Sequence, residues 1–149
     1  MPRREYLGRL IDHLHLVVCD VEQSRRFYRA VLGSIGVELT FDAPNAFACD
    51  ELYVSNDAGA LGHSTAPHRI HLAFQAKTRE QVDEFYQSAL AAGGRDNGPP
   101  GIRRYHPSYY AAFVFDPDGN NIEVVHHGRA ARSADVITLD IEGATQPGG

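Results

Sequence analysis

The chain has 149 residues, of which 43% are hydrophobic and 22% charged, so its length and composition are those of one ordinary globular domain. Its 14 Lys and Arg residues against 19 Asp and Glu residues give a net charge of −5, which leaves no basic excess for binding nucleic acid. The two cysteines lie far apart and no apolar run could cross a bilayer, so we expect a cytoplasmic protein without disulfides, secretion signal or membrane contact.

The first half of the chain predicts a strand, a helix and then shorter strands. Residues 11–18 (IDHLHLVV) are rich in β-branched and apolar residues and are predicted to form a strand. An amphipathic stretch over 21–36 follows Asp20, a residue type that caps helices, and predicts a helix. Shorter strands are predicted within 37–42 and 46–57, and a linker rich in Gly and Pro follows them.

The second half repeats this order. Residues 69–76 predict a strand, and 79–94 predict a helix that begins after a Thr78 cap. The apolar residues expected on the inward face of this helix are Val82, Phe85, Ala89 and Leu90. Residues 95–107 (RDNGPPGIRRYHP) predict a turn-rich loop.

A hairpin closes the second half. Strands are predicted at 108–115 and 121–127, joined by the turn DPDGN at 116–120. The tail is rich in Ala, Asp and Gly, and within it residues 136–141 (VITLDI) are a candidate for an extra strand.

The two halves are related by an internal repeat. Placing residues 13–36 over 71–94, an offset of 58 without a gap, gives eight identities in 24 positions. The identities include His13 with His71 and the Phe-Tyr pair of each helix. Two copies are too few for a solenoid, so the pattern predicts a duplicated module.

Polar residues share one face of the predicted strands. Because strand side chains alternate between the two faces, His13 and His15 lie on one face of the first strand, and Asn121, Glu123 and His127 on one face of the last. If the two modules pack about a pseudo-twofold axis, His13 and His71 come near one another. Imidazole and carboxylate groups are ligands of zinc, iron, manganese, cobalt or nickel.

Three stretches of the sequence resemble a known family. They are DHLHLVVCDVEQSRRFYRAVLG, HLAFQAKTREQVDEFY and YYAAFVFDPDGNNIEVVHH, and they resemble the vicinal oxygen chelate superfamily, which includes glyoxalase I, extradiol dioxygenases and the fosfomycin and bleomycin resistance proteins. The resemblance covers roughly residues 10–127. It implies an α+β fold in which two tandem βαβββ modules form a cupped mixed β-sheet with helices on the outside.

The resemblance also implies the domain organisation. We expect one domain over residues 1–149, with module 1 at about 8–60, module 2 at about 67–128 and a C-terminal tail at 129–149. It further implies a homodimer.

A metal site follows from the resemblance, residue by residue. In that superfamily the ligands come from the first strand of each module and the last strand of the second, which are His13, His71 and Glu123 here. The implied cofactor is a divalent ion, Zn, Fe, Mn, Ni or Co. Glyoxalase I has a fourth, carboxylate ligand where this chain places Tyr53, with Glu51 two residues before it, so the resemblance favours the dioxygenase and thiol-transferase branches.

The resemblance implies a function and leaves an alternative open. The implied function is a metal-dependent lyase or dioxygenase that acts on a small oxygen-bearing substrate by Lewis-acid stabilisation of an anionic intermediate. The alternative is a metal-free protein of the bleomycin-resistance type that binds a drug or aromatic compound. Aromatic residues that would suit the alternative are Phe47, Tyr53, Tyr110 and Phe113.

Further polar residues are candidates for catalysis. His15 shares the face of His13 and could contact the substrate, although a structural role suits it equally. His106, Tyr109 and Tyr110 lie where a loop enters the second hairpin and could relay a proton.

Overall fold

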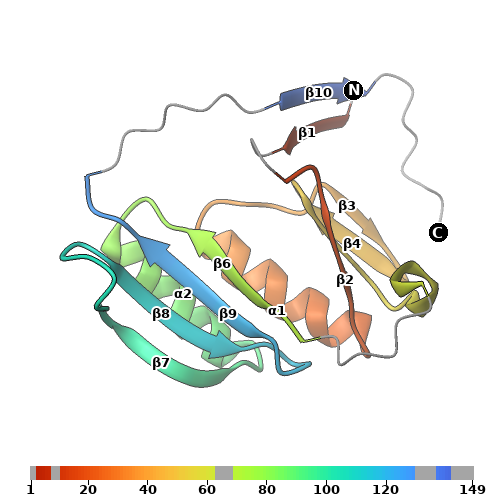
Figure 1. Cartoon of the computed structure of the whole chain (residues 1–149). Coiled ribbons are helices and arrows are strands. Elements are labelled where there is room, and N and C mark those ends of the chain that lie inside the picture. The colour runs from red at the N-terminus through yellow and green to blue at the C-terminus, as the bar shows by residue number, and fades with distance from the viewer. Residues whose placement is uncertain (1–2, 8–10, 63–68, 130–136, 142–149) are drawn as a thin grey trace. The chain divides into compact units, whose positions relative to one another are not determined.

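The computed structural model describes residues 3–7, 11–62, 69–129 and 137–141 of the chain (Figure 1). It confirms the α+β class, with two four-stranded mixed sheets and two α-helices. Within the described residues, every helix is too short or too polar to traverse a bilayer.

The described elements fall into two compact units. The first unit holds the strands within residues 3–55, the short 3-10 helix η1 (Ala58–Leu61) and strand β10 (Ile137–Ile141). The second unit holds the strands and the helix within residues 71–126, together with residues Glu22–Gly36, which contain nearly all of helix α1 (Val21–Ser34). The helix of the first repeat therefore belongs to the unit formed by the second.

The first unit is built on the sheet with strand order β2-β5-β4-β3. Strand β2 pairs parallel to β5, and the remaining neighbours pair antiparallel. Its strands are β2 (Leu14–Val17), β3 (Phe41–Ala43), β4 (Ala46–Cys49) and β5 (Leu52–Ser55). The segment predicted as strand within 46–57 is thus a hairpin, because Asp50, at a φ of 45°, turns the chain between β4 and β5. Helix η1 (Ala58–Leu61) follows β5.

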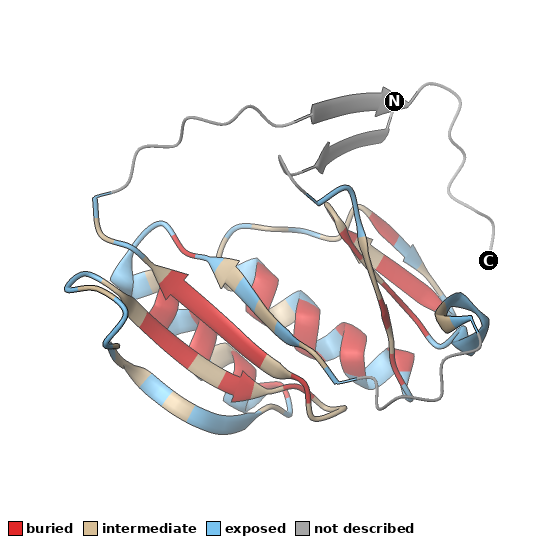
Figure 2. Ribbon diagram, in the orientation of Figure 1, coloured by how far each residue is buried: buried red, intermediate tan, exposed pale blue. Residues whose placement is uncertain are grey.

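The second unit repeats this topology with the order β6-β9-β8-β7. Its strands are β6 (His71–Gln75), β7 (Arg95–Ile102), β8 (Tyr110–Phe115) and β9 (Asn121–His126). Strand β6 pairs parallel to β9, while β8 pairs antiparallel to β7 and β9. Helix α2 (Arg79–Ala91) packs across β7, β8 and β9. In this unit burial is concentrated on β8, β9, α1 and the inner face of α2 (Figure 2).

The two helices begin at positions related by the repeat offset. Helix α1 (Val21–Ser34) starts 58 residues before α2. Thr78 is the N-cap of α2, as predicted, and its hydroxyl accepts a hydrogen bond of 3.1 Å from the backbone N–H of Gln81. Gly36 follows α1 at a φ of 83°, a conformation that glycine adopts without strain.

The inward face of α2 differs from its prediction at one residue. Val82, Phe85 and Ala89 are buried, but Leu90 is 37% exposed, so its predicted inward position is wrong. Tyr86 is buried instead. A helix turns about 100° per residue, which places Leu90 at the edge of the stripe that the other residues form.

The predicted loop at 95–107 contains a strand. Residues Arg95–Ile102 form β7, whose pairing with β8 shifts register on both sides of Gly98. Two prolines and two glycines remove the alternating pattern by which strands are recognised, and an edge strand tolerates them because one of its sides needs no partner. The loop is confined to the residues between β7 and β8.

A two-stranded ribbon lies outside the two main sheets. Strand β1 (Arg3–Leu7) pairs antiparallel with β10 (Ile137–Ile141), in a register that aligns Glu5 with Leu139. The extra strand expected in the tail is therefore present, and the rest of the predicted tail after Arg129 lies outside the described residues.

Candidate metal centre

His71 opens strand β6 and presents its two ring nitrogens to different partners. Its Nδ1 atom lies 3.2 Å from the backbone carbonyl of Asn121, the residue paired with it on β9. Its Nε2 atom lies 3.0 Å from Oε1 of Glu123. A carbonyl oxygen only accepts hydrogen bonds, so Nδ1 donates to Asn121. The carboxylate at Nε2 also only accepts, so Nε2 either donates a second ring proton to it or shares an ion with it.

Glu123 is a buried carboxylate in the middle of β9. Its side chain is 4% exposed, against 50% for His71. Oε2 accepts a hydrogen bond from the phenol of Tyr109, which follows the loop between β7 and β8. Burial, followed by this hydrogen bond, raises the pKa of Tyr109 well above its ordinary value, so the phenol remains a donor. The carboxylate is thus held between a phenol and an imidazole.

This pair of side chains fits a divalent metal ion. Nε2 of His71 faces a carboxylate oxygen at 3.0 Å, and either an ion or a ring proton between the two atoms makes that contact favourable. Two ligands about 2.1 Å from an octahedral ion and at right angles lie about 3.0 Å apart, which is the separation found here, whereas a tetrahedral ion would place them about 3.4 Å apart. The Nδ1 contact to a backbone carbonyl is the outer hydrogen bond that metal-binding histidines usually make.

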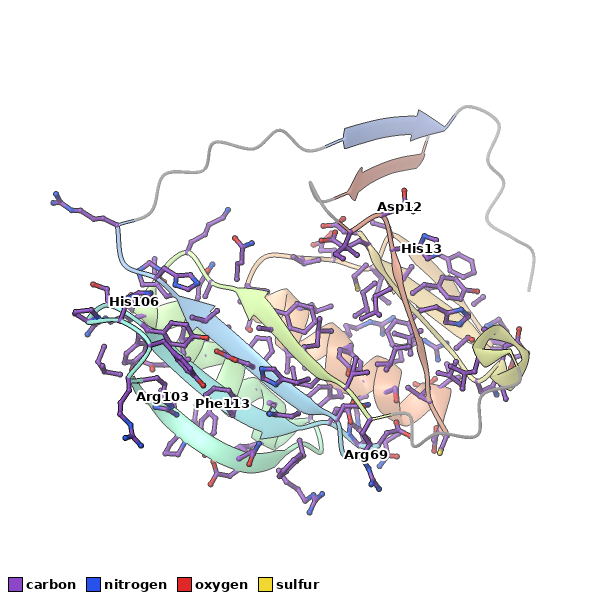
Figure 3. The ribbon with its side chains drawn as sticks, in the orientation of Figure 1. Asp12, His13, Arg69, Arg103, His106 and Phe113 are labelled. Atoms are coloured by element: carbon purple, nitrogen blue, oxygen red, sulfur yellow. The ribbon has the colours of Figure 1, made fainter. Side chains whose placement is uncertain are left out.

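His13, the third predicted ligand, also has a hydrogen-bond acceptor at its Nδ1 atom, as His71 does. It directly precedes β2, and its Nδ1 atom lies 2.6 Å from the carboxylate of Asp12, which accepts the ring proton. The side chain is 68% exposed, so Nε2 is available to a ligand. Figure 3 shows Asp12 and His13 together at the start of β2.

The three predicted ligands divide between the two units. His71 and Glu123 contact one another in the second unit, and His13 belongs to the first. Over the parts of the chain that the structure describes, no three His, Cys, Asp or Glu side chains form a ligand set. The pair His71–Glu123 is therefore an observed contact, and the participation of His13 stays a prediction.

His15 has a partner of its own in the first unit. Its Nε2 atom lies 2.7 Å from the hydroxyl of Ser55, and its ring meets that of Tyr53 edge to face. Tyr53 stacks in turn on Phe41. Phe47, considered for an aromatic pocket, is fully buried in the core of this unit.

His106 and His127 form a pair beside Tyr109. His106 Nδ1 accepts from the backbone N–H of Ser108, so His106 Nε2 carries the proton and donates it over 2.9 Å to His127 Nδ1. The rings of both histidines contact the ring of Tyr109, which ties the pair to the phenol that holds Glu123.

Tyr110 faces away from His71 and Glu123. Its phenol donates a 2.7 Å hydrogen bond to Asp83 of α2, and the Arg79 guanidinium lies over its ring. The hydrogen bond to Asp83, followed by burial, raises the pKa of Tyr110. Tyr109 directly precedes β8, and neighbouring residues of extended backbone point to opposite faces, so Tyr110 contacts the helix while Tyr109 contacts Glu123.

Comparison with known proteins identifies the family. The family model of the Glyoxalase/Bleomycin resistance protein/Dioxygenase superfamily matches residues 10–124, most of the chain. The chain belongs to this superfamily. The resemblance seen in the sequence to the vicinal oxygen chelate superfamily is thereby confirmed.

The chain is also similar to individual proteins. An uncharacterized protein, YqjT, of Bacillus subtilis (strain 168) is 30% identical over 128 residues, which cover 77% of this chain and 97% of the relative. A solved glyoxalase/bleomycin resistance protein from Albidiferax ferrireducens T118 is 28% identical with a TM-score of 0.64, over 78% of this chain and 98% of that one.

A third relative has an enzyme name. The lactoylglutathione lyase structure from Agrobacterium tumefaciens is 23% identical with a TM-score of 0.53, over 79% of this chain and 93% of that one. At this identity the likeness concerns the fold alone. The superfamily includes enzymes, and its members commonly use divalent metals.

Proposed function

We propose that this protein is a divalent-metal-dependent enzyme, a lyase or dioxygenase, that acts on a small oxygen-bearing substrate. His71 and Glu123 would hold the ion together with His13. When bound, the ion supplies a Lewis acid that stabilises negative charge on a substrate oxygen. Two imidazoles and one carboxylate leave further coordination positions for that substrate.

The observation that carries the proposal is the 3.0 Å contact between Nε2 of His71 and Oε1 of Glu123. The Asn121 carbonyl accepts the proton of Nδ1, which leaves Nε2 as the nitrogen that can bind an ion beside the buried carboxylate. Asp12 fixes the same tautomer at His13, which is the equivalent residue in the other repeat. Two histidines that bind one ion through Nε2 are both expected to carry their ring proton on Nδ1.

The test is metal binding by untagged protein. The protein is stripped with a chelator and reloaded separately with Zn, Mn, Fe, Co and Ni, and bound metal is measured by elemental analysis and calorimetry. We expect one ion per chain for at least one metal, with a loss of affinity of 100-fold or more in His71→Ala and Glu123→Gln.

His126→Ala is the matched control. His126 lies on the same strand as Glu123 with the opposite parity, and its Nδ1 contacts the carbonyl of Ala76. Binding that is absent for every metal, or that His71→Ala and His126→Ala weaken equally, contradicts the proposal. Retention of an aromatic ligand by the chelated protein would favour the metal-free binding function instead.

A further inference from the structure

Arg103 lies on the face of the second sheet that carries Glu123. Phe113 of β8 is directly opposite Glu123 on β9 and opposite Gly98 on β7, so all three positions share one face. The Arg103 guanidinium carbon lies 5.3 Å from the centroid of the Phe113 ring. The Phe113 ring is also stacked with that of His71, at a centroid distance of 6.1 Å. One aromatic ring thus contacts both the imidazole of the metal centre and a cation.

The backbone of β7 is shaped to accept the guanidinium. A Cβ atom at Gly98 would lie 3.2 Å from one terminal nitrogen of Arg103, and one at Gly101 would lie 3.1 Å from the other. The same side chain donates a 2.7 Å hydrogen bond to the carbonyl of Pro99. The two glycines leave room for the planar group, and the carbonyl fixes its rotation, so it is held in place before any ligand binds.

The charge of Arg103 is available to a ligand. Among the described residues no carboxylate forms an ion pair with it, and the Pro99 carbonyl occupies one of its five N–H donors. Its positive charge acts at the phenol of Tyr109, the residue that holds Glu123. Figure 3 shows Arg103 beside Phe113 over the β7 and β8 part of the sheet.

We propose that Arg103 binds an anionic group of the substrate, a carboxylate or a phosphate, whose other end is held at the metal centre. The fork of guanidinium donors matches the paired oxygens of both anions. Neighbouring strands lie about 4.8 Å apart, so the substrate spans roughly 5 to 10 Å from Glu123 to Arg103. The inference rests on the proposed function and names its substrate class, an organic anion with a metal-binding oxygen at its far end.

The test uses dicarboxylates as probes on metal-loaded protein. Succinate, glutarate, adipate and pimelate are titrated by calorimetry, each beside its mono-amide, which has the same shape and one charge fewer. The best-fitting dicarboxylate is expected to bind about ten-fold or more tightly than its mono-amide. Phosphonocarboxylates of the same length show which anion is preferred.

Arg103→Met keeps the apolar stem on Phe113 and removes the charge. It is expected to remove the preference for the dicarboxylate and to leave the affinity for the metal, measured without any probe, unchanged. Arg104→Met is the matched control, because Arg104 is the adjacent, exposed arginine. A preference that survives Arg103→Met, or that Arg104→Met reduces equally, overturns the proposal.

Failure of the metal centre is distinguishable from failure of the Arg103 site. Metal affinity is measured first, without any probe, and its absence contradicts only the proposed function. Benzoate, which carries a single carboxylate, is then titrated into metal-free wild-type protein and into Arg103→Met. Weaker binding to the variant supports the anion site, and equal binding overturns it.

Discussion

The phenol of Tyr28 on α1 donates a 2.6 Å hydrogen bond to Oδ2 of Asp116, the first residue of the DPDGN turn. Both side chains are buried, and 88 residues separate them in the sequence. Asp116 also accepts hydrogen bonds from the backbone N–H groups of Asp118 and Asn120 and from the Asn120 side chain. A single carboxylate therefore organises the turn before β9 and attaches α1 to it.

Removing that phenol is expected to destabilise the protein. Tyr28→Phe deletes one hydrogen bond to a buried carboxylate and should lower the free energy of unfolding by about 1.5 to 3 kcal/mol. The measurement is urea denaturation followed by circular dichroism. Tyr105→Phe is the control, since Tyr105 is 74% exposed and its change should stay within about 0.5 kcal/mol. Equal urea midpoints for Tyr28→Phe and Tyr105→Phe would contradict a stabilising role for the Tyr28 hydrogen bond.

The contribution of Tyr28 should depend on pH. Burial, followed by the negative charge of Asp116, raises the pKa of Tyr28 well above its ordinary value of 10.0. A raised pKa in the folded state gives stability that is complete below the unfolded pKa, about 10, and is lost as the pH rises toward the folded value. The stability difference between wild type and Tyr28→Phe should thus be constant from pH 7 to 9 and shrink above about pH 10. A stability difference between the two proteins that grows above pH 10 would contradict this prediction.

Replacing two glycines near helix ends with alanine should change the stability of the protein in opposite directions. A Cβ atom at Gly94 would lie 2.7 Å from Phe27 and 2.8 Å from the carbonyl of Ala89, whereas one at Gly33 meets nothing within 4 Å. Gly94→Ala should lower the free energy of unfolding by about 1 to 3 kcal/mol. Gly33→Ala lies inside α1 and should raise it by up to about 1 kcal/mol. Thermal melts of both variants provide the check.

Loss of the Tyr109 hydroxyl should weaken metal binding without abolishing it. Tyr109 donates to Oε2 of Glu123 and so positions the carboxylate that we propose as a ligand. Tyr109→Phe is expected to lower metal affinity by about ten-fold, as outer hydrogen-bond partners of ligands generally do. Calorimetry on stripped protein measures this, with Tyr105→Phe as the control. Unchanged affinity would show that Glu123 needs no such support.

Asp12 offers a separate test of His13. Asp12→Asn removes the carboxylate that holds the Nδ1 proton of His13, and it should weaken metal binding by about ten-fold if His13 is a ligand. His13→Ala should weaken it further. Metal affinity that is unaffected in His13→Ala would limit the centre to the second unit.

The internal repeat allowed much of the fold to be predicted. The 58-residue offset places both helices at their observed starts and aligns β2 with β6. The hairpin of β8 and β9 was predicted from its turn, and both strands are present. Strand β7 was missed because its prolines and glycines remove the alternation that reveals a strand.

The candidate site was predictable only in part. The sequence and its family resemblance proposed His71 and Glu123, which prove to be in contact, and noted Tyr109 only as one of several loop residues. The sequence did not single out Arg103, because its placement depends on Phe113, which is ten residues further along the chain. The neighbouring Gly98 and Gly101 were the one available signal, and in a segment assumed to be loop they suggested turns.

The membership of α1 in the second unit bears on how the repeat arose. The first half of the gene encodes a helix that completes a turn encoded by the second half, through Tyr28 and Asp116. We expect neither half to be an autonomous folding unit. A single ancestral module would have needed this helix from a second copy of itself, and joining two copies in one chain would supply it at a high effective concentration.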